Sequence, residues 1–193
     1  MTDWKKILNH PLFNVAYFFF IRQVVKVFNL DSPEWLSTVR TFYLGSQFIV
    51  ILLSVNLLSI IRKKNDANVL KYVEPGGKRW DGSVIEDRLV NTTNMEYDLD
   101  QVNTQLKQNF TSLAIIAFIH LKFGYVQPLL MQSIMGFKAF FMTKEARIHY
   151  LHGNTTTGEL RRPFAVEGFW NARRQPKTDK GSIKRAEKML KSQ

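Results

Sequence analysis

The sequence predicts an all-α integral membrane protein with three to four membrane-embedded helices, the last two a short hairpin, and a basic cytosolic tail. Three observations predict this class. A run of 21 residues from Thr41 to Ile61 carries no charge, and a basic cluster, Arg62 to Lys64, follows at once. The third observation is an excess of positive charge after Thr143, where twelve basic residues face five acidic residues.

The uncharged run is the clearest membrane span, and it ends the first predicted region, residues 1–61, which holds the first two membrane helices. A helix rises ~1.5 Å per residue, so a run of this length crosses the ~30 Å hydrocarbon layer of a bilayer. Lysine and arginine next to a span tend to stay in the cytosol. We therefore predict that Ile61 lies at the cytosolic end of the span.

The other helix of this region is predicted from Pro11 to Leu30, where polar residues interrupt an apolar segment. Arg22, Lys26 and Asn29 recur at the spacing i, i+4 and i+7, which predicts a single polar stripe. Two interpretations stay open. Ionisable groups inside a span cost about 2.5–3.5 kcal/mol each, which favours a hydrated groove. Alternatively, the long side chains reach back to the membrane surface.

Residues 62–108 are predicted to form a cytosolic loop that ends in an amphipathic helix. Basic and acidic residues balance in this region, and Pro75-Gly76-Gly77 indicates a turn. Leu99, Val102 and Leu106 recur at helical spacing after Asp98. This pattern predicts a short helix that leads into the membrane.

Residues 109–142 are predicted to form a membrane hairpin. The apolar segment that begins at Phe110 is ended by His120 and Lys122, and Pro128 opens a second apolar stretch. The first helix of the hairpin reaches only ~21 Å, which is less than the thickness of the hydrocarbon core. The hairpin therefore either thins the bilayer around a polar groove or extends into the interface through its flanks.

Residues 143–193 are predicted to form the basic cytosolic tail, which carries +7 of the net charge of +11. Arginines alternate with aromatic residues here, a pattern that suits ribosomal RNA and anionic lipid surfaces equally. The predicted contact residues are Arg161, Arg162, Trp170, Arg173, Arg174, Lys184 and Arg185. The tail is cytosolic if both halves of the hairpin cross the membrane and lumenal if only one half crosses.

The chain offers no recognisable catalytic chemistry. It contains no cysteine, which excludes disulfides, thiolate metal sites and thiol nucleophiles. His120 has no carboxylate or second histidine at the spacing of a metal site. We therefore expect a protein that is not an enzyme and that needs no metal and no cofactor.

Five sequence blocks resemble one protein family. They are Tyr72–Gly76 (YVEPG), Glu96–Leu99 (EYDL), Gln127–Ile134 (QPLLMQSI), Gly158–Phe164 (GELRRPF) and Pro176–Glu187 (PKTDKGSIKRAE). Their order and spacing are similar to those of the fungal SRP-independent ER targeting protein 3 family, formerly named the inorganic phosphate transport protein family. The resemblance implies a multi-pass protein of the endoplasmic reticulum membrane. It also implies several partners: the Sec translocon, the ribosome, other SRP-independent targeting components, client membrane proteins and membrane lipids.

Together these patterns favour an insertase or translocon partner. In this hypothesis a hydrophilic groove lowers the cost of moving the polar flanks of a client through lipid, where each unpaired polar group costs several kcal/mol. The predicted groove residues are Arg22, Lys26, Asn29, Gln47, His120, Gln127 and Gln132. The alternatives are an inorganic phosphate transporter or its accessory, and a non-catalytic membrane adaptor.

Overall fold

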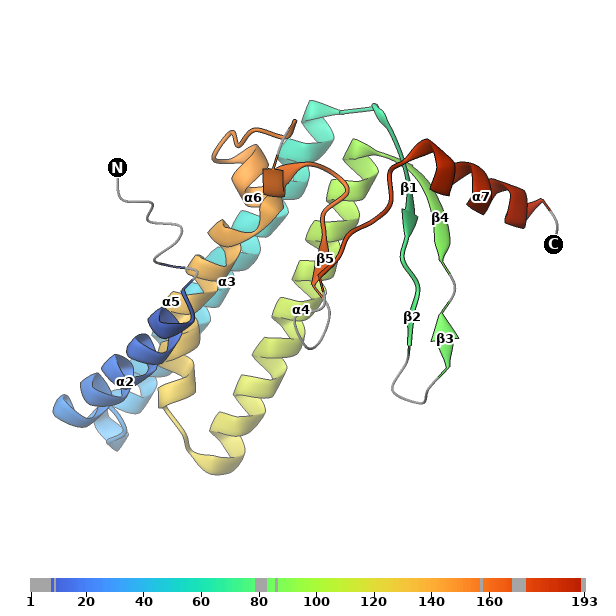
Figure 1. Ribbon diagram of the computed structural model, residues 1–193. Helices are drawn as coiled ribbons and strands as arrows, with labels where there is room; N and C mark the ends of the chain where they lie inside the picture. The colour runs from blue at the N-terminus through green and yellow to red at the C-terminus, as the bar shows by residue number, and fades with distance from the viewer. Residues whose placement is uncertain are drawn as a thin grey trace. The chain divides into compact units, whose positions relative to one another are not determined.

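The chain forms two compact units in the computed structural model (Figure 1). Residues 8, 10–78, 83–85, 87–156, 158–167 and 173–191 are described. Unit 1 comprises Met1–Val55 and Thr104–Met142, and unit 2 comprises Asn56–Asn103 and Thr143–Gln193. Each unit is therefore built from two separate stretches of sequence, and two long helices contribute residues to both units.

Unit 1 is helical. It contains α2 (Pro11–Val27) and α5 (Gln127–Met142), together with the first part of α3 (Pro33–Lys64) and the last part of α4 (Asn94–Phe123). Helix α2 lies beside α5 (Figure 1). The prediction of a helical membrane protein is confirmed to this extent: α3, with 32 residues, is long and apolar enough to cross a membrane.

The number of membrane crossings beyond α3 stays a prediction. Helices α2 and α5 have 17 and 16 residues, so they extend about 25 Å each, slightly less than a hydrocarbon core. Within the described residues, α3 is the single helix that satisfies the length and composition of a full span.

Helix α4 does not stop at the predicted border between the cytosolic loop and the hairpin. It begins with a capping box, in which Thr93 Oγ1 accepts from the Glu96 amide at 3.2 Å and the Glu96 carboxylate accepts from the Thr93 amide at 3.3 Å. It then runs for 30 residues to Phe123, and Gly124 follows with a φ of +71°. The border between residues 108 and 109 therefore falls inside one continuous helix, since no helix-breaking residue occurs there.

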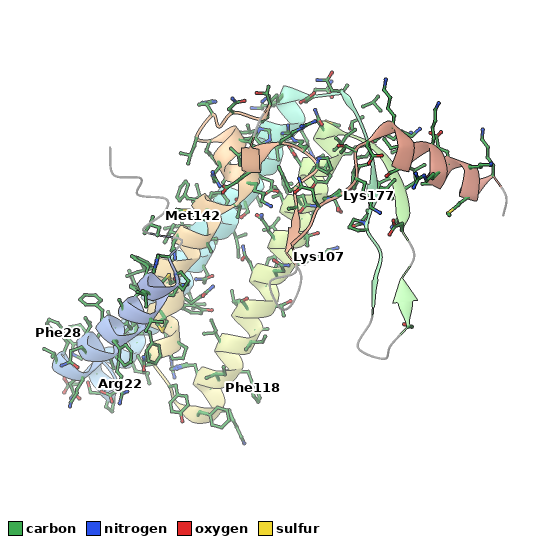
Figure 2. All side chains as sticks on the ribbon, in the orientation of Figure 1. Arg22, Phe28, Lys107, Phe118, Met142 and Lys177 are labelled. Carbon is green, nitrogen blue, oxygen red and sulfur yellow. The ribbon has the colours of Figure 1, made fainter. Side chains whose placement is uncertain are left out.

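Unit 1 has an apolar exterior. Almost all of the large apolar side chains that the structure exposes belong to this unit, including Phe28 and Phe118, which Figure 2 labels. Its buried residues include the polar side chains Ser46, Gln47, Ser54, His120 and Ser133. So many exposed apolar side chains, beside a core that also holds polar groups, are expected where lipid surrounds the helices.

Unit 2 contains strands that the all-α prediction omitted. Strands β1 (Val69–Glu74) and β4 (Arg88–Thr93) pair antiparallel, and β2 (Gly77–Lys78) pairs with β3 (Val84–Ile85) between them. Strands β5 (Val166–Glu167) and β6 (Arg173–Arg174) form another short pair. The fold class was wrong on this point because two-residue and six-residue strands leave little periodicity in a sequence.

Three helical segments complete unit 2: α6 (Lys144–His149), the 3₁₀ helix η1 (Gly158–Leu160) and α7 (Lys180–Leu190). Asp179 caps α7 by accepting a hydrogen bond from the Ser182 amide at 2.7 Å. Helix α7 packs against β1 and β4 (Figure 1). The C-terminal helix therefore packs on the antiparallel pair of strands β1 and β4 in unit 2.

Candidate functional site

Gln47 and Gln132, two predicted groove residues, meet inside unit 1. Gln47 is buried, and its Nε2 donates to the backbone carbonyl of Gln132 at 3.3 Å. Gly136 lies beside this contact, because a Cβ at that position would be 3.4 Å from Gln47 Nε2. The structure thus places one polar link between α3 and α5.

His120 joins a basic residue that the sequence analysis missed. Arg40 Nε donates to His120 Nε2 at 2.9 Å, and His120 Nδ1 lies 3.0 Å from the carbonyl oxygen of Tyr125. Accepting through one ring nitrogen and donating through the other leaves the imidazole uncharged. The positive charge of Arg40 is therefore not neutralised by its partner. The position of Arg40, directly before the uncharged run, is the sequence signal that could have identified it.

Gln127 lies at the start of α5, near an apolar cluster of Val39, Tyr43, Val126 and Leu129. Its Nε2 is buried without a hydrogen-bond partner in the described part of the chain, and so is the hydroxyl of Tyr43. Unsatisfied buried polar atoms are rare in folded proteins. Unit 1 therefore keeps unused hydrogen-bonding capacity next to the turn between α4 and α5.

Only two of the three residues of the predicted polar stripe lie on α2. Arg22 and Lys26 are exposed on the helix, and Figure 2 labels Arg22. Asn29 was wrongly assigned to the helix: α2 ends at Val27, and Asn29 adopts a left-handed conformation with a φ of +50°. The Leu30 amide donates to the carbonyl of Val25 at 3.0 Å, which is the closing bond of a Schellman motif.

Lys138 is a second basic residue that the predicted groove omitted. It is half-buried on α5, and its Nζ donates to Asn14 Oδ1 on α2 at 2.7 Å. The same ammonium group lies 4.6 Å from the centroid of the Phe13 ring. An amide oxygen and a ring face stabilise the cation without neutralising it.

Unit 2 is built around a buried carboxylate. Asp98 is 1% exposed and accepts hydrogen bonds from Arg162 Nε at 2.6 Å, from the Arg162 guanidinium a second time, and from His149 Nε2 at 2.7 Å. Burial by itself would raise the pKa of Asp98, but the hydrogen bonds from His149 and Arg162 outweigh it and lower that pKa. The Asp98 cluster, defined as Asp98, His149 and Arg162, thus holds an ionised carboxylate in the interior.

Unit 2 also contains an apolar core that includes Tyr72, Tyr97 and Phe164. The Tyr97 hydroxyl accepts from the Phe164 amide at 2.9 Å, and the rings of Tyr72, Tyr97 and Phe164 pack edge to face. Burial, followed by the charge of Glu74, raises the pKa of Tyr72 to about 12. The blocks YVEPG, EYDL and GELRRPF therefore meet in one core, which sequence order alone did not reveal.

The residues predicted to contact polyanions differ in their exposure to solvent. Arg162 is held inside the Asp98 cluster, whereas Arg161, Lys184 and Arg185 are exposed. Trp170 and the side chains of Arg173 and Arg174 lie outside the described residues. Arg162 is therefore not a candidate for a surface contact, because a buried and paired guanidinium cannot reach a partner. The other predicted contacts stay predictions.

The C-terminal segment is attached to β1 by further contacts. The backbone of Lys177, labelled in Figure 2, pairs with Val73 at 2.9 and 3.0 Å, and its Nζ lies 3.1 Å from Asp87 Oδ2. Lys71 on β1 forms an ion pair with Glu187 on α7. Among the described residues, no group of three or more His, Asp or Glu has an arrangement that could hold a metal ion.

Comparison with known proteins agrees with the block resemblance. The sequence profile described as Phosphate transport (Pho88) matches residues 8–193. SRP-independent targeting protein 3 of Saccharomyces cerevisiae is 33% identical over 183 residues, which are 94% of this chain and 95% of that protein. The SRP-independent targeting protein 3 homolog of Schizosaccharomyces pombe is 33% identical over 189 residues, or 97% and 96% of the two chains. No solved structure matches significantly. The resemblance is thus confirmed, and the chain belongs to the Phosphate transport (Pho88) family.

Proposed function

We propose that this protein takes part in SRP-independent targeting of proteins to the endoplasmic reticulum membrane, and that it acts there as an insertase or translocon partner. The names of two relatives that align along almost the whole chain support the targeting role. The observation that carries the insertase role is that unit 1 combines many exposed apolar side chains with several buried polar ones.

A multi-pass topology is part of the proposal. Residues 104–142 connect two stretches that fold together in unit 2. In the proposed topology this connection leaves one side of the membrane and returns to it. This supports a hairpin made from the end of α4 and all of α5. The basic cluster Arg62 to Lys64 favours the cytosol for that side.

In the proposed mechanism, the polar groups of unit 1 receive the polar flank of a client while its apolar segment moves into lipid. Buried Gln47 and His120, with the Gln132 carbonyl and the exposed Arg40 to which they are hydrogen-bonded, supply donors and acceptors. Each hydrogen bond made there offsets part of the several kcal/mol that an unpaired polar group costs in hydrocarbon. No covalent step is involved, so the proposed activity is not that of an enzyme and requires no cofactor.

We assign the proposed contacts with the ribosome or anionic lipid to the exposed basic residues of unit 2, Arg161, Lys184 and Arg185. The Sec translocon and the other SRP-independent targeting components are the proposed protein partners. Both assignments rest on the resemblance and on the charge of α7, which attracts polyanions.

The test is insertion of a client into vesicles that contain the full-length protein. Protease protection of a client with one hydrophobic segment should exceed that in protein-free vesicles, and replacing Arg22 and Lys26 with Leu should reduce it. Replacing Lys107 and Lys122, two exposed basic residues of α4, is the matched control. Equal protection with and without the protein would contradict the insertase role. Uptake of radiolabelled phosphate above the protein-free level would favour transport instead.

A further inference from the structure

The charged residues of unit 1 are almost all basic. In its described part they are Arg22, Lys26, Arg40, Lys107, Lys122 and Lys138, against the acidic residues Asp31 and Glu34. Both acidic residues are exposed and lie in the short segment between α2 and the first turn of α3. No ion pair within the described part of unit 1 neutralises any of these basic groups.

Lys138 is half-buried, whereas the other described basic residues of unit 1 are exposed. It lies between α5 and α2, with the Asn14 amide oxygen at 2.7 Å and the Phe13 ring at 4.6 Å. Both neighbours orient the ammonium group but carry no negative charge. A positive charge that is partly removed from water and not paired acts strongly on any other charge that comes near it.

Resting on the proposed function, we infer that unit 1 selects its clients by charge, and that Lys138 sets this preference. The preferred client carries carboxylates in the polar flank that crosses the membrane, next to its hydrophobic segment. A carboxylate replaces the neutral Asn14 oxygen as the partner of Lys138, whereas a lysine or arginine in the flank is repelled. Arg40 acts in the same direction, because its partner His120 is uncharged in the observed arrangement.

The experiment compares three clients that differ only in two residues of the translocated flank: Glu-Glu, Gln-Gln or Lys-Lys. Insertion into vesicles containing the full-length protein is measured by protease protection. The Glu-Glu client should insert about tenfold better than the Lys-Lys client. Lys138→Gln should reduce this ratio to within about twofold and leave the Gln-Gln client unchanged, while Lys138→Arg should keep the ratio.

Lys107→Gln is the matched control, since it removes one exposed positive charge from the same unit. If it lowers the ratio as much as Lys138→Gln does, the net charge of unit 1 sets the client preference, and the assignment to Lys138 is wrong. Equal insertion of the three clients by the wild-type protein would overturn the inference and leave the insertase role intact. If none of the clients inserts better than in protein-free vesicles, the proposed function itself fails.

Vesicles of a second lipid composition show whether the anion that binds Lys138 belongs to the client or to a lipid headgroup. The preference should persist in vesicles of phosphatidylcholine alone. If it appears only when phosphatidylserine is present, the anion at Lys138 is a lipid headgroup and the client inference is overturned.

Discussion

The guanidinium group of Arg162 donates two hydrogen bonds to the carboxylate of Asp98, although the two residues are 64 positions apart in the chain. Both side chains are almost completely buried, and His149 donates a further hydrogen bond to the same carboxylate. This contact joins α4 to the segment that follows η1, and it makes the C-terminal part of the chain an integral piece of unit 2. The basic tail is thus, in part, a folded structure with an ionic core.

Removing the Arg162 side chain is expected to destabilise unit 2. Arg162→Ala leaves a buried carboxylate without its main partner, and breaking a buried ion pair in this way costs about 3–5 kcal/mol. Thermal unfolding of the purified protein in detergent measures the effect. Arg161→Ala, at the exposed neighbouring position, is the control and should change stability little. Equal melting temperatures for the two variants would show that the pair does not hold the unit together.

Acid should unfold unit 2 only at low pH. Because the pKa of Asp98 is lowered on folding, its contribution to stability is complete above its unfolded pKa, near ~3.9, and is lost as the pH falls through the lower folded value. The melting temperature should therefore change little between about pH 8 and pH 5 and decrease below about pH 4. Asp98→Asn should be less stable at neutral pH and less sensitive to acid. A parallel pH profile for the variant would contradict this assignment.

Helix α7 should contribute to binding of anionic surfaces through its exposed charges. Lys184→Gln with Arg185→Gln is expected to weaken binding to phosphatidylserine vesicles or to ribosomes by about fivefold per charge. For ribosomes, the slope of log affinity against log salt should fall by about one per charge. Sedimentation of the protein with vesicles and, separately, with ribosomes shows which of these two partners α7 binds. Unchanged binding of the double variant to both partners would show that α7 is not part of the contact surface.

The two stretches of unit 2 should lie on one side of the membrane. Asn91 on β4 and Asn154 after α6 are exposed, and both stand in glycosylation sequons, Asn91-Thr92-Thr93 and Asn154-Thr155-Thr156. In microsomes we expect both to remain unglycosylated and both stretches to be cut by protease added from the cytosolic side. Glycosylation of Asn154 with an unmodified Asn91 would contradict a hairpin that returns to its starting side.

The contact between α3 and α5 should tolerate a methyl group but no larger side chain. A Cβ at Gly136 lies 3.4 Å from Gln47 Nε2, so Gly136→Ala fits and should stabilise the helix by about 0.4–1 kcal/mol. Gly136→Leu should destabilise the protein by about 1–3 kcal/mol, because it forces Gln47 away from Gln132. Gly45→Leu is the control, since nothing lies within 4 Å of a Cβ at Gly45. Similar unfolding temperatures for the two Leu variants would contradict this packing.

Local features of the chain were readable from the sequence. The span from Thr41 to Ile61 lies within α3, because an uncharged run flanked by Arg62 to Lys64 needs no distant partner to be recognised. The amphipathic pattern after Asp98 was predicted for the same reason and is observed within α4. The family was likewise evident from short blocks whose order is a property of the sequence itself.

The tertiary structure decided which of these residues meet. Arg161 and Arg162 are identical in type and adjacent, yet one is exposed and the other is buried against Asp98. Arg40 and His120, and likewise Lys138 and Asn14, are paired across 80 and 124 positions. Periodicity reports which face of a helix a residue occupies, whereas a buried ion pair or hydrogen bond depends on which faces the chain brings together. The free energy of that pairing arises only on folding, when the two groups leave water together.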